Sequence, residues 1–279
     1  MMTATSPHIK IRDPQLDDLE GTSESLLMQD ILYKILRIAK LNSNVFIVGE
    51  IGSGKKRLAH LIHRKSNRAH NPFHSFYCID IDEHEYKNAF WGQLTFEEEY
   101  LTLKYDALEK ARAGILYLDQ FSELSEFYML KIVDSYLKGC TQLFRYNKKE
   151  TPRLILSFNQ ESYQDLVNTK TWSSLLDQLN PVVIILPPLR ERKEDIPLLI
   201  DYFLNEIKEN YKEYKDLKIS AKALYECFNY SWPGNIRQLK NALLQGAILS
   251  YGKTIECRHL PFSMSWQLPY ELDSKKMSK

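Results

Sequence analysis

The chain has 279 residues, of which 44% are hydrophobic and 26% charged, and its formal net charge is +1. This size allows one sizeable hydrophobic core and a smaller second unit. The net charge is too small to attract nucleic acid or an anionic membrane over the whole surface. Apolar runs are too short to span a bilayer, and the stretch MMTATSPHIK lacks the apolar core of a signal peptide. Four scattered cysteines favour free thiols, so a soluble cytoplasmic protein is expected.

The first two thirds of the chain alternate between strand and helix patterns. Residues 1–22 are polar and are expected to be a tail, and a helix is predicted from Ser23, with apolar residues at Met28, Ile31, Leu32, Ile35 and Ile38. A short buried strand is predicted at 45–48, and further strands are predicted at 73–81, 115–119, 153–158 and 182–187. Near-continuously apolar strands that alternate with helices indicate an α/β fold with a parallel sheet covered on both faces.

After Pro188 the pattern becomes helical. Three helices are predicted, over residues 194–212, 220–228 and 233–252, with no strand between them. The expected organisation is therefore a tail over 1–22, an α/β unit over 23–188, a helical subdomain over 189–262 and a tail over 263–279. The 22 residues before Ser23 are too few for a sensory domain. The 18 after Pro261 are too few for a helix-turn-helix, so no direct DNA binding is expected.

The stretch GEIGSGKK, Gly49–Lys56, follows the first predicted strand and opens a helix. In this context G-x-x-x-x-G-K is typical of a phosphate-binding loop, in which backbone N–H groups surround the phosphate oxygens and the lysine reaches the β- and γ-phosphates. The alternative is an ordinary glycine-rich turn. The predicted binding residues are Gly49, Glu50, Ile51, Gly52, Ser53, Gly54, Lys55 and Lys56; the last stands where many such loops carry Ser or Thr for magnesium.

The strand ILYLD ends with Asp119, followed by Gln120. A carboxylate at this place coordinates Mg²⁺ in phosphate-loop nucleotidases, so Asp119 is the predicted metal residue, with a turn or helix cap as the alternative. Many such enzymes use a carboxylate at the next position to activate water. The amide of Gln120 can hydrogen-bond water but cannot take its proton at neutral pH. Gln120 marks the position of the catalytic carboxylate, and no residue is assigned a catalytic role from the sequence.

Several motifs together resemble one family, the AAA+ domain of sigma-54-dependent (NtrC-type, bacterial enhancer-binding) transcriptional activators. They are GEIGSGKK, SNRAHNPF, GILYLD, LPPLRERKEDIP, YSWPGNIRQLKNAL and IECRHLP, spread from about Ser23 to Pro261. The resemblance implies an AAA+ P-loop fold in which a C-terminal helical lid and the α/β part clamp ATP, protomers form a ring, and hydrolysis remodels polymerase bound to sigma-54. It also implies nucleotide sensors at Arg237 and Asn159; a surface salt bridge and a turn amide are the respective alternatives.

The chain departs from the family at the residues of hydrolysis and of sigma-54 contact. Gln120 replaces the acidic residue, Tyr77 replaces the asparagine that switches it, and counting back from VVIILPPL places the two arginine fingers at Trp172 and Gln178. No GAFTGA motif occurs in Gln93–Tyr100, where Glu97–Glu99 are expected to form a solvated helix start. The chain is thus identified as a degenerate member, with hydrolysis slow or absent.

Three interpretations of the whole remain open from the sequence. The favoured one is a protein that binds ATP or ADP, with Mg²⁺ possible, and regulates transcription through a protein partner such as a sigma-54 activator, the RNA polymerase machinery or copies of itself in a ring. The second is a working ATPase in which Gln120 orients water and Arg190 or Arg192 acts across a subunit interface. The third is an interaction scaffold that no longer uses nucleotide.

Overall fold

The computed structural model describes residues 23–78, 93–97, 100–104 and 106–261. These residues form two compact units. The α/β unit comprises Leu26–Pro188. The helical unit comprises the residues from Leu189 onward together with those up to Ser25.

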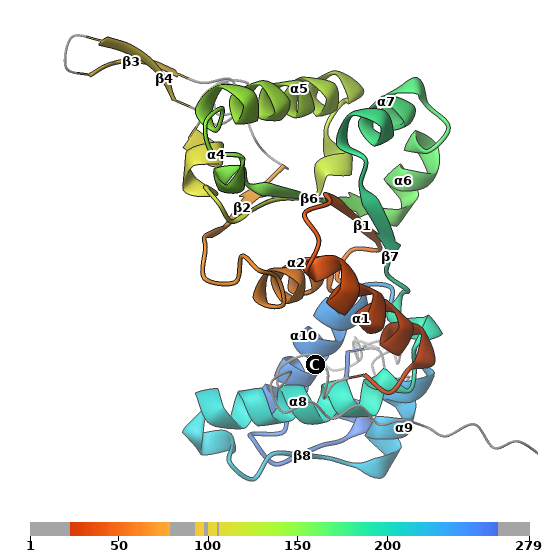
Figure 1. Ribbon diagram of the computed structural model, residues 1–279. Helices are drawn as coiled ribbons and strands as arrows, with labels where there is room; N and C mark the ends of the chain where they lie inside the picture. Colours follow the sequence, from red (N-terminus) through yellow and green to blue (C-terminus); the bar gives the residue numbers. More distant parts are fainter. Residues whose placement is uncertain (1–22, 79–92, 98–99, 105, 262–279) are drawn as a thin grey trace, which may run out of the picture. The chain divides into compact units, whose positions relative to one another are not determined.

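The α/β unit is built on a five-stranded parallel sheet with the order β2-β5-β6-β1-β7 (Figure 1). Its strands are β1 Val45–Gly49, β2 Phe73–Tyr77, β5 Ile115–Asp119, β6 Arg153–Asn159 and β7 Val182–Ile185. This confirms the predicted parallel sheet. Residues of β1 are buried throughout, as expected for an apolar strand with strands on both sides and helices on both faces.

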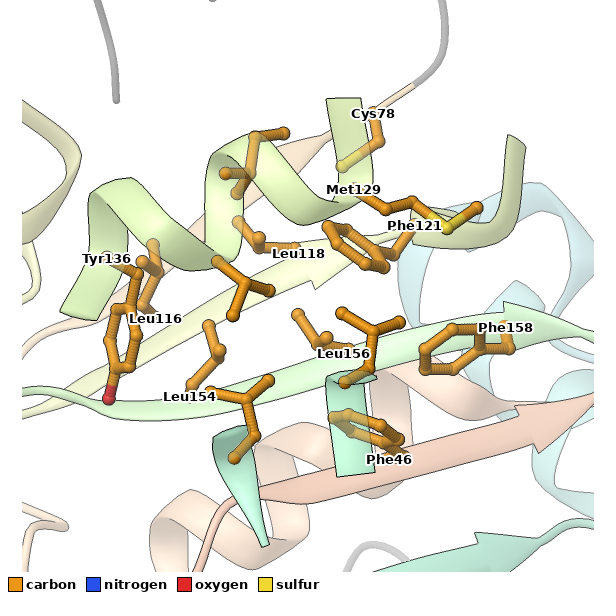
Figure 2. Packing of buried hydrophobic residues seen from close by; sticks show 14 of the residues in the cluster. Phe46, Cys78, Leu116, Leu118, Phe121, Met129, Tyr136, Leu154, Leu156 and Phe158 are labelled. Carbon is orange, nitrogen blue, oxygen red and sulfur yellow. The ribbon is translucent and has the colours of Figure 1, made fainter. Parts of the chain in front are cut away.

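Helices cover both faces of the sheet, with α4, α5 and α7 on one side and α1 and α2 on the other (Figure 1). The bounds are α1 Leu26–Ala39, α2 Lys55–Arg64, α4 Asp106–Lys110, α5 Glu126–Leu143, α6 Gln160–Leu166 and α7 Lys170–Leu179. Short 3₁₀ helices occur in both units, at η4 Phe121–Glu123, η5 Lys148–Glu150, η6 Leu189–Glu191, η7 Lys212–Tyr214 and η8 Cys257–His259. Under α5, apolar side chains of β5, β6 and β1 interdigitate with Met129 and Tyr136 (Figure 2). Burial of this layer is the main force that holds the unit together.

A hairpin occupies the region where a helix start was expected. β3, Gln93–Glu97, pairs in antiparallel register with β4, Tyr100–Lys104. The expected helix start is therefore wrong at Glu97, which ends β3; Glu98 and Glu99 lie outside the described residues. The sequences QLTFE and YLTLK alternate polar and apolar residues, a period of two that is typical of strands. The run of three glutamates obscures this alternation in the sequence.

The helical unit contains α8 Asp195–Asn210, α9 Ala221–Asn229 and α10 Asn235–Leu249. The expectation of no strand between these helices was wrong, because β8, Lys218–Ile219, lies between α8 and α9 and pairs with β9, Thr254–Ile255. Two-residue strands are too short to produce a readable period.

The family-like WPGN segment holds the helical unit together. The Trp232 side chain is fully buried and donates from Nε1 to the Cys227 carbonyl at 2.7 Å. The Asn235 side chain accepts from the backbone N–H of Leu189 at 2.7 Å, which ties the start of the unit to α10. The four cysteines are free thiols, and none of the described helices is both long and apolar enough to span a bilayer.

Candidate functional site

The residues singled out in the α/β unit converge at the carboxyl-terminal edge of the sheet. Gly49, at the end of β1, pairs with Asn159 at the end of β6, and Tyr77 at the end of β2 pairs with Asp119 at the end of β5. Since parallel strands present their carboxyl ends at one edge, the loop after β1 and these side chains share that edge. Open α/β sheets bind ligands at this edge.

The glycine-rich loop has a backbone shape suited to an anion. Gly52 and Gly54 have φ values of 77° and 108°, in the left-handed region that side chains other than glycine rarely adopt. The loop leads directly into α2, whose first turn holds no acidic residue and receives no hydrogen bond from an N-cap side chain. The partial positive charge of this helix end is therefore not offset by a local carboxylate or cap.

Lys55 lies inside the loop rather than in solvent. Its side chain is buried, and Nζ donates to the carbonyl oxygens of Gly49 at 2.6 Å and Glu50 at 3.0 Å. These contacts hold the ammonium group against the loop backbone, next to the start of α2. Lys56, one residue on, is exposed and points its charge away from the packed interior.

Asp119 is held by side chains from two strands. Its Oδ1 accepts from the Tyr117 hydroxyl at 2.9 Å and from the Ser157 hydroxyl at 2.7 Å. Burial, with the Asp119 charge beside it, raises the pKa of Tyr117 well above its usual range, so this hydroxyl stays a donor. The contacts do not resemble those of a helix cap, because in the described part of the chain the carboxylate accepts no backbone N–H.

Gln120 is placed in an unusual backbone conformation, with φ 57° and ψ 42°. Its backbone N–H donates to Ser157 Oγ at 2.8 Å, so one hydroxyl positions both Gln120 and Asp119. The Gln120 Oε1 atom is buried and has no hydrogen-bond partner among the described residues. The neighbouring Tyr77 is 51% exposed, and its phenol offers no amide to orient a carboxylate.

Asn159 lies at the point where β6 passes into α6. Its backbone N–H donates to Ser122 Oγ at 2.8 Å, and its side chain makes no cap hydrogen bond to α6. Sequence reasoning missed the supporting hydroxyls of Tyr117, Ser122 and Ser157. A serine inside the apolar run RLILSF was the available signal for the last of these.

The two positions assigned to arginine fingers have different surroundings. Trp172 is 5% exposed and packs against Phe46 and Phe158, with ring centroids 5.6 and 5.5 Å apart. The count therefore fails at this position, because its side chain faces the core of its own unit. Gln178 is exposed on α7 and donates to Ser174 Oγ at 2.6 Å. The spacing of Trp172, Leu175 and Leu179 would have identified the buried face.

The arginines of the helical unit also differ in burial. Arg237 is exposed on α10 and forms no ion pair within the described part of the chain, so the alternative of a surface salt bridge finds no partner there. Arg192 is 4% exposed, and burial lowers its pKa to about 10 despite the nearby Asp195 carboxylate. A buried guanidinium is a poor candidate for action across a subunit interface. Arg190, two residues earlier, is exposed.

A metal ion at the sheet edge would depend on a ligand for most of its coordination. Among residues 23–78 and 106–261, no three His, Cys, Asp or Glu side chains are grouped closely enough to hold an ion. Mg²⁺ commonly takes one or two carboxylates and completes its shell with phosphate oxygens and water. The single carboxylate of Asp119 fits that arrangement.

Family models match almost the whole chain. The sigma-54 interaction domain matches residues 21–184, and the AAA+ ATPase lid domain matches residues 190–276. The Nif-specific regulatory protein of Azotobacter vinelandii is 32% identical over 239 residues, covering 82% of this chain and 44% of its own length. The regulatory protein AtoC of Escherichia coli is 32% identical over 253 residues, covering 86% and 52%. The chain thus spans about half the length of these relatives.

Solved structures agree with these relationships. NtrX from Brucella abortus in complex with ADP matches with a TM-score of 0.71 and 30% identity, over 90% of this chain and 59% of that one. Its complex with ATP matches with a TM-score of 0.69 and 29% identity, over 92% and 61%. The parallel sheet, the loop before α2 and the helical unit are those of an AAA+ P-loop protein. The chain belongs to the family of sigma-54-dependent activators of transcription, through its sigma-54 interaction domain and AAA+ lid domain.

Proposed function

We propose that this chain binds ATP or ADP as a conformational or assembly ligand, hydrolyses it very slowly or not at all, and regulates transcription through a protein partner. The observation that carries the proposal is the contrast at one sheet edge. The loop holds a buried Lys55 beside an uncapped helix start, whereas Gln120 places an amide where hydrolysis needs a carboxylate.

The binding half of the proposal rests on the loop and its neighbours. The N–H groups of Gly52 to Lys55 and the start of α2 would surround the phosphates, and Lys55 Nζ would exchange its carbonyl contacts for phosphate oxygens. Bound Mg²⁺ would neutralise charge on the β- and γ-phosphates, and Asp119 would hold it directly or through water. The ADP and ATP complexes of the similar NtrX structure support nucleotide as the ligand. Asn159 and Arg237 are the proposed sensors.

The proposal that hydrolysis is very slow or absent rests on the lack of a side chain that can remove a proton from water. Gln120 Oε1, which lacks a partner in the described part of the chain, can accept a hydrogen bond from water but cannot remove its proton. Gln178, the predicted finger position that lies on the surface, carries an amide in place of a guanidinium. Loss of an arginine finger alone costs a factor of about 10³ or more in rate.

A protein partner is proposed because the chain belongs to the family but lacks the family's sigma-54-contacting motif. Members act on the sigma-54 form of RNA polymerase, but this chain has no GAFTGA motif, and a β3–β4 hairpin lies where that loop was sought. We therefore place the contact with another protein, either a sigma-54 activator in a mixed ring or the polymerase machinery reached through different residues.

A thermal-shift titration with ATP, ADP and a non-hydrolysable analogue, followed by a phosphate-release assay on the same sample, tests both halves. Stabilisation by all three nucleotides is expected, since a ligand selective for the native state must raise Tm. It should be lost in Lys55→Ala and kept in Lys56→Ala, the matched control. An unchanged Tm at saturating nucleotide and Mg²⁺ would favour a nucleotide-independent scaffold.

The release assay separates the remaining alternative. Phosphate release near background is expected for the native chain and for Gln120→Ala. Turnover on the order of 1 s⁻¹ or faster would establish a working ATPase and overturn the second half of the proposal. If that turnover fell in Gln120→Ala, the amide would be the group that orients water.

A further inference from the structure

A cavity lies at the opposite edge of the sheet from the phosphate loop. It has a volume of about 610 Å³, which is within the roughly 300–1,000 Å³ of small-molecule sites. Its walls include Asn42 before β1, the segment Thr151–Arg153 at the start of β6, and part of α5. Because the strands are parallel, these amino-terminal ends lie at the far edge from Gly49 and Asp119. The cavity is thus independent of the candidate nucleotide site.

Among the described residues, the cavity is lined by four cations and by no carboxylate. The cations are Arg68, Arg145, Lys148 and Arg153, and none of them forms an ion pair within the described part of the chain. The nearby Glu150 is engaged elsewhere, since it accepts from Arg112 and from Asn147. Only Arg153 of the four is buried, and no carboxylate pairs with any of them in the described part of the chain, so the cluster leaves a local excess of positive charge.

Arg153 supplies that charge at the most buried point. It is 2% exposed, and its Nε, Nη1 and Nη2 donate to the carbonyls of Ser43, Ala39 and Ile38 at 2.7, 3.1 and 3.0 Å. Burial lowers the pKa of Arg153 to about 10, and the charge of Arg68 adds to this effect. The three carbonyl groups accept the hydrogen bonds of Arg153 but do not neutralise its charge. Arg153 would therefore attract an anion in the cavity through its positive charge rather than by hydrogen bonds to it.

The direct contacts would come from the other three cations and an amide. Arg68 uses Nη1 for the carbonyls of Ala113 and Thr151, both at 2.8 Å, and Nη2 for Asn42 Oδ1 at 3.3 Å. Its Nε–H and the Asn42 amide hydrogens have no acceptor in the described part of the chain. Arg145 and Lys148 are exposed at the rim, and neither side chain forms a hydrogen bond within the described part of the chain, although Arg145 lies over the Tyr146 ring. The donors thus extend from the half-buried Arg68 to the exposed, charged rim of the cavity.

We propose that this cavity binds a small phosphorylated ligand carrying two or more negative charges. Guanidinium groups match the oxygens of a phosphate group in geometry as well as in charge. The cationic lining without a carboxylate selects an anion, and the volume exceeds what one inorganic ion would fill. The site is separate from the phosphate loop, so a ligand there and a nucleotide at Lys55 would occupy the chain together.

Calorimetric titration of the full chain with inorganic pyrophosphate at low ionic strength tests the proposal. The Lys55→Ala background removes the phosphate loop as a competing site, so binding there is expected to persist. Arg145→Gln/Lys148→Gln should weaken it at least tenfold. Lys149→Gln, an exposed neighbour outside the cavity, should leave the Kd unchanged. These rim residues are exposed and lack hydrogen-bonded partners, so the variants are expected to fold.

Three outcomes would overturn the proposal. The first is no heat of binding in Lys55→Ala, which would confine phosphate binding to the loop. The second is equal weakening in Lys149→Gln, which would indicate attraction to general surface charge. The third is binding of citrate in place of pyrophosphate, which would refute a phosphate-selective cavity. Each result leaves the nucleotide proposal to be judged by the thermal-shift titration of the Lys55 variant.

Discussion

Removing the Ser157 hydroxyl tests how the candidate site is held together. The hydroxyl donates to Asp119 Oδ1 at 2.7 Å and accepts from the Gln120 N–H at 2.8 Å, and the residue is fully buried in β6. A hydrogen bond to a charged group contributes about 1.5–3 kcal/mol, and an ordinary one about 0.5–1.5 kcal/mol. Ser157→Ala should therefore lower the free energy of unfolding by about 3 kcal/mol.

For a unit of this size, about 3 kcal/mol corresponds to a fall in Tm of about 6–12 °C, which scanning calorimetry measures directly. The matched control is Ser162→Ala, since that hydroxyl makes a single 3.3 Å contact with Glu123 in an exposed setting. Ser157→Ala should also reduce the additional rise in Tm that Mg²⁺ gives in the presence of ATP, because Asp119 loses one of its two side-chain donors. Equal Tm shifts in the two variants would refute the reasoning.

Three further changes have defined outcomes. Trp172→Arg should cost about 4 kcal/mol or more by urea denaturation, through lost packing and a buried charge, whereas Gln178→Arg at an exposed position should stay within about 0.5 kcal/mol. Gly114→Ala would place Cβ 1.8 Å from the Pro72 carbonyl oxygen, so a loss of about 2 kcal/mol, measured by thermal circular dichroism, is expected; native-like stability would contradict this contact. Burial raises the pKa of Cys140 and Cys227 from 9.0 to about 12. Their contribution to stability should thus be complete below pH 9 and lost as pH rises toward 12, and Ellman's reagent at pH 8 should label them far more slowly in the native chain than in urea.

Much of the fold followed from local patterns in the sequence. Four of the five strands are nearly continuous apolar runs, whereas β2 contains His74 and Ser75. The glycine-rich loop lies between the first strand and a helix with a clear apolar face. Each such signal lies within roughly ten to fifteen consecutive residues, so it can be recognised without knowing which distant segments pack against it. The confirmed membership of the sigma-54 activator family rests on motifs of the same local kind.

The features that were missed depend on contacts between distant segments. Ser157 reaches Asp119 only because β5 and β6 are adjacent, a pairing across 38 residues of sequence. The burial of Trp172 requires Phe46 and Phe158 as neighbours, whereas a count along the chain places it without regard to packing. The β3–β4 hairpin was missed because the run of glutamates obscured its period of two. The pair β8–β9 was missed because two-residue strands are too short to show a period.

The three carbonyl contacts of Arg153 also set a limit on where the α/β unit can be cut. The guanidinium binds the last turn of α1 and the segment that follows it, so β6 in the middle of the sheet depends on a helix at the start of the unit. A truncated chain that began at Leu41 would leave the Arg153 guanidinium without two of its three acceptors. We therefore expect a stable fragment of this unit to include at least the last turn of α1, although the phosphate loop itself starts at Gly49.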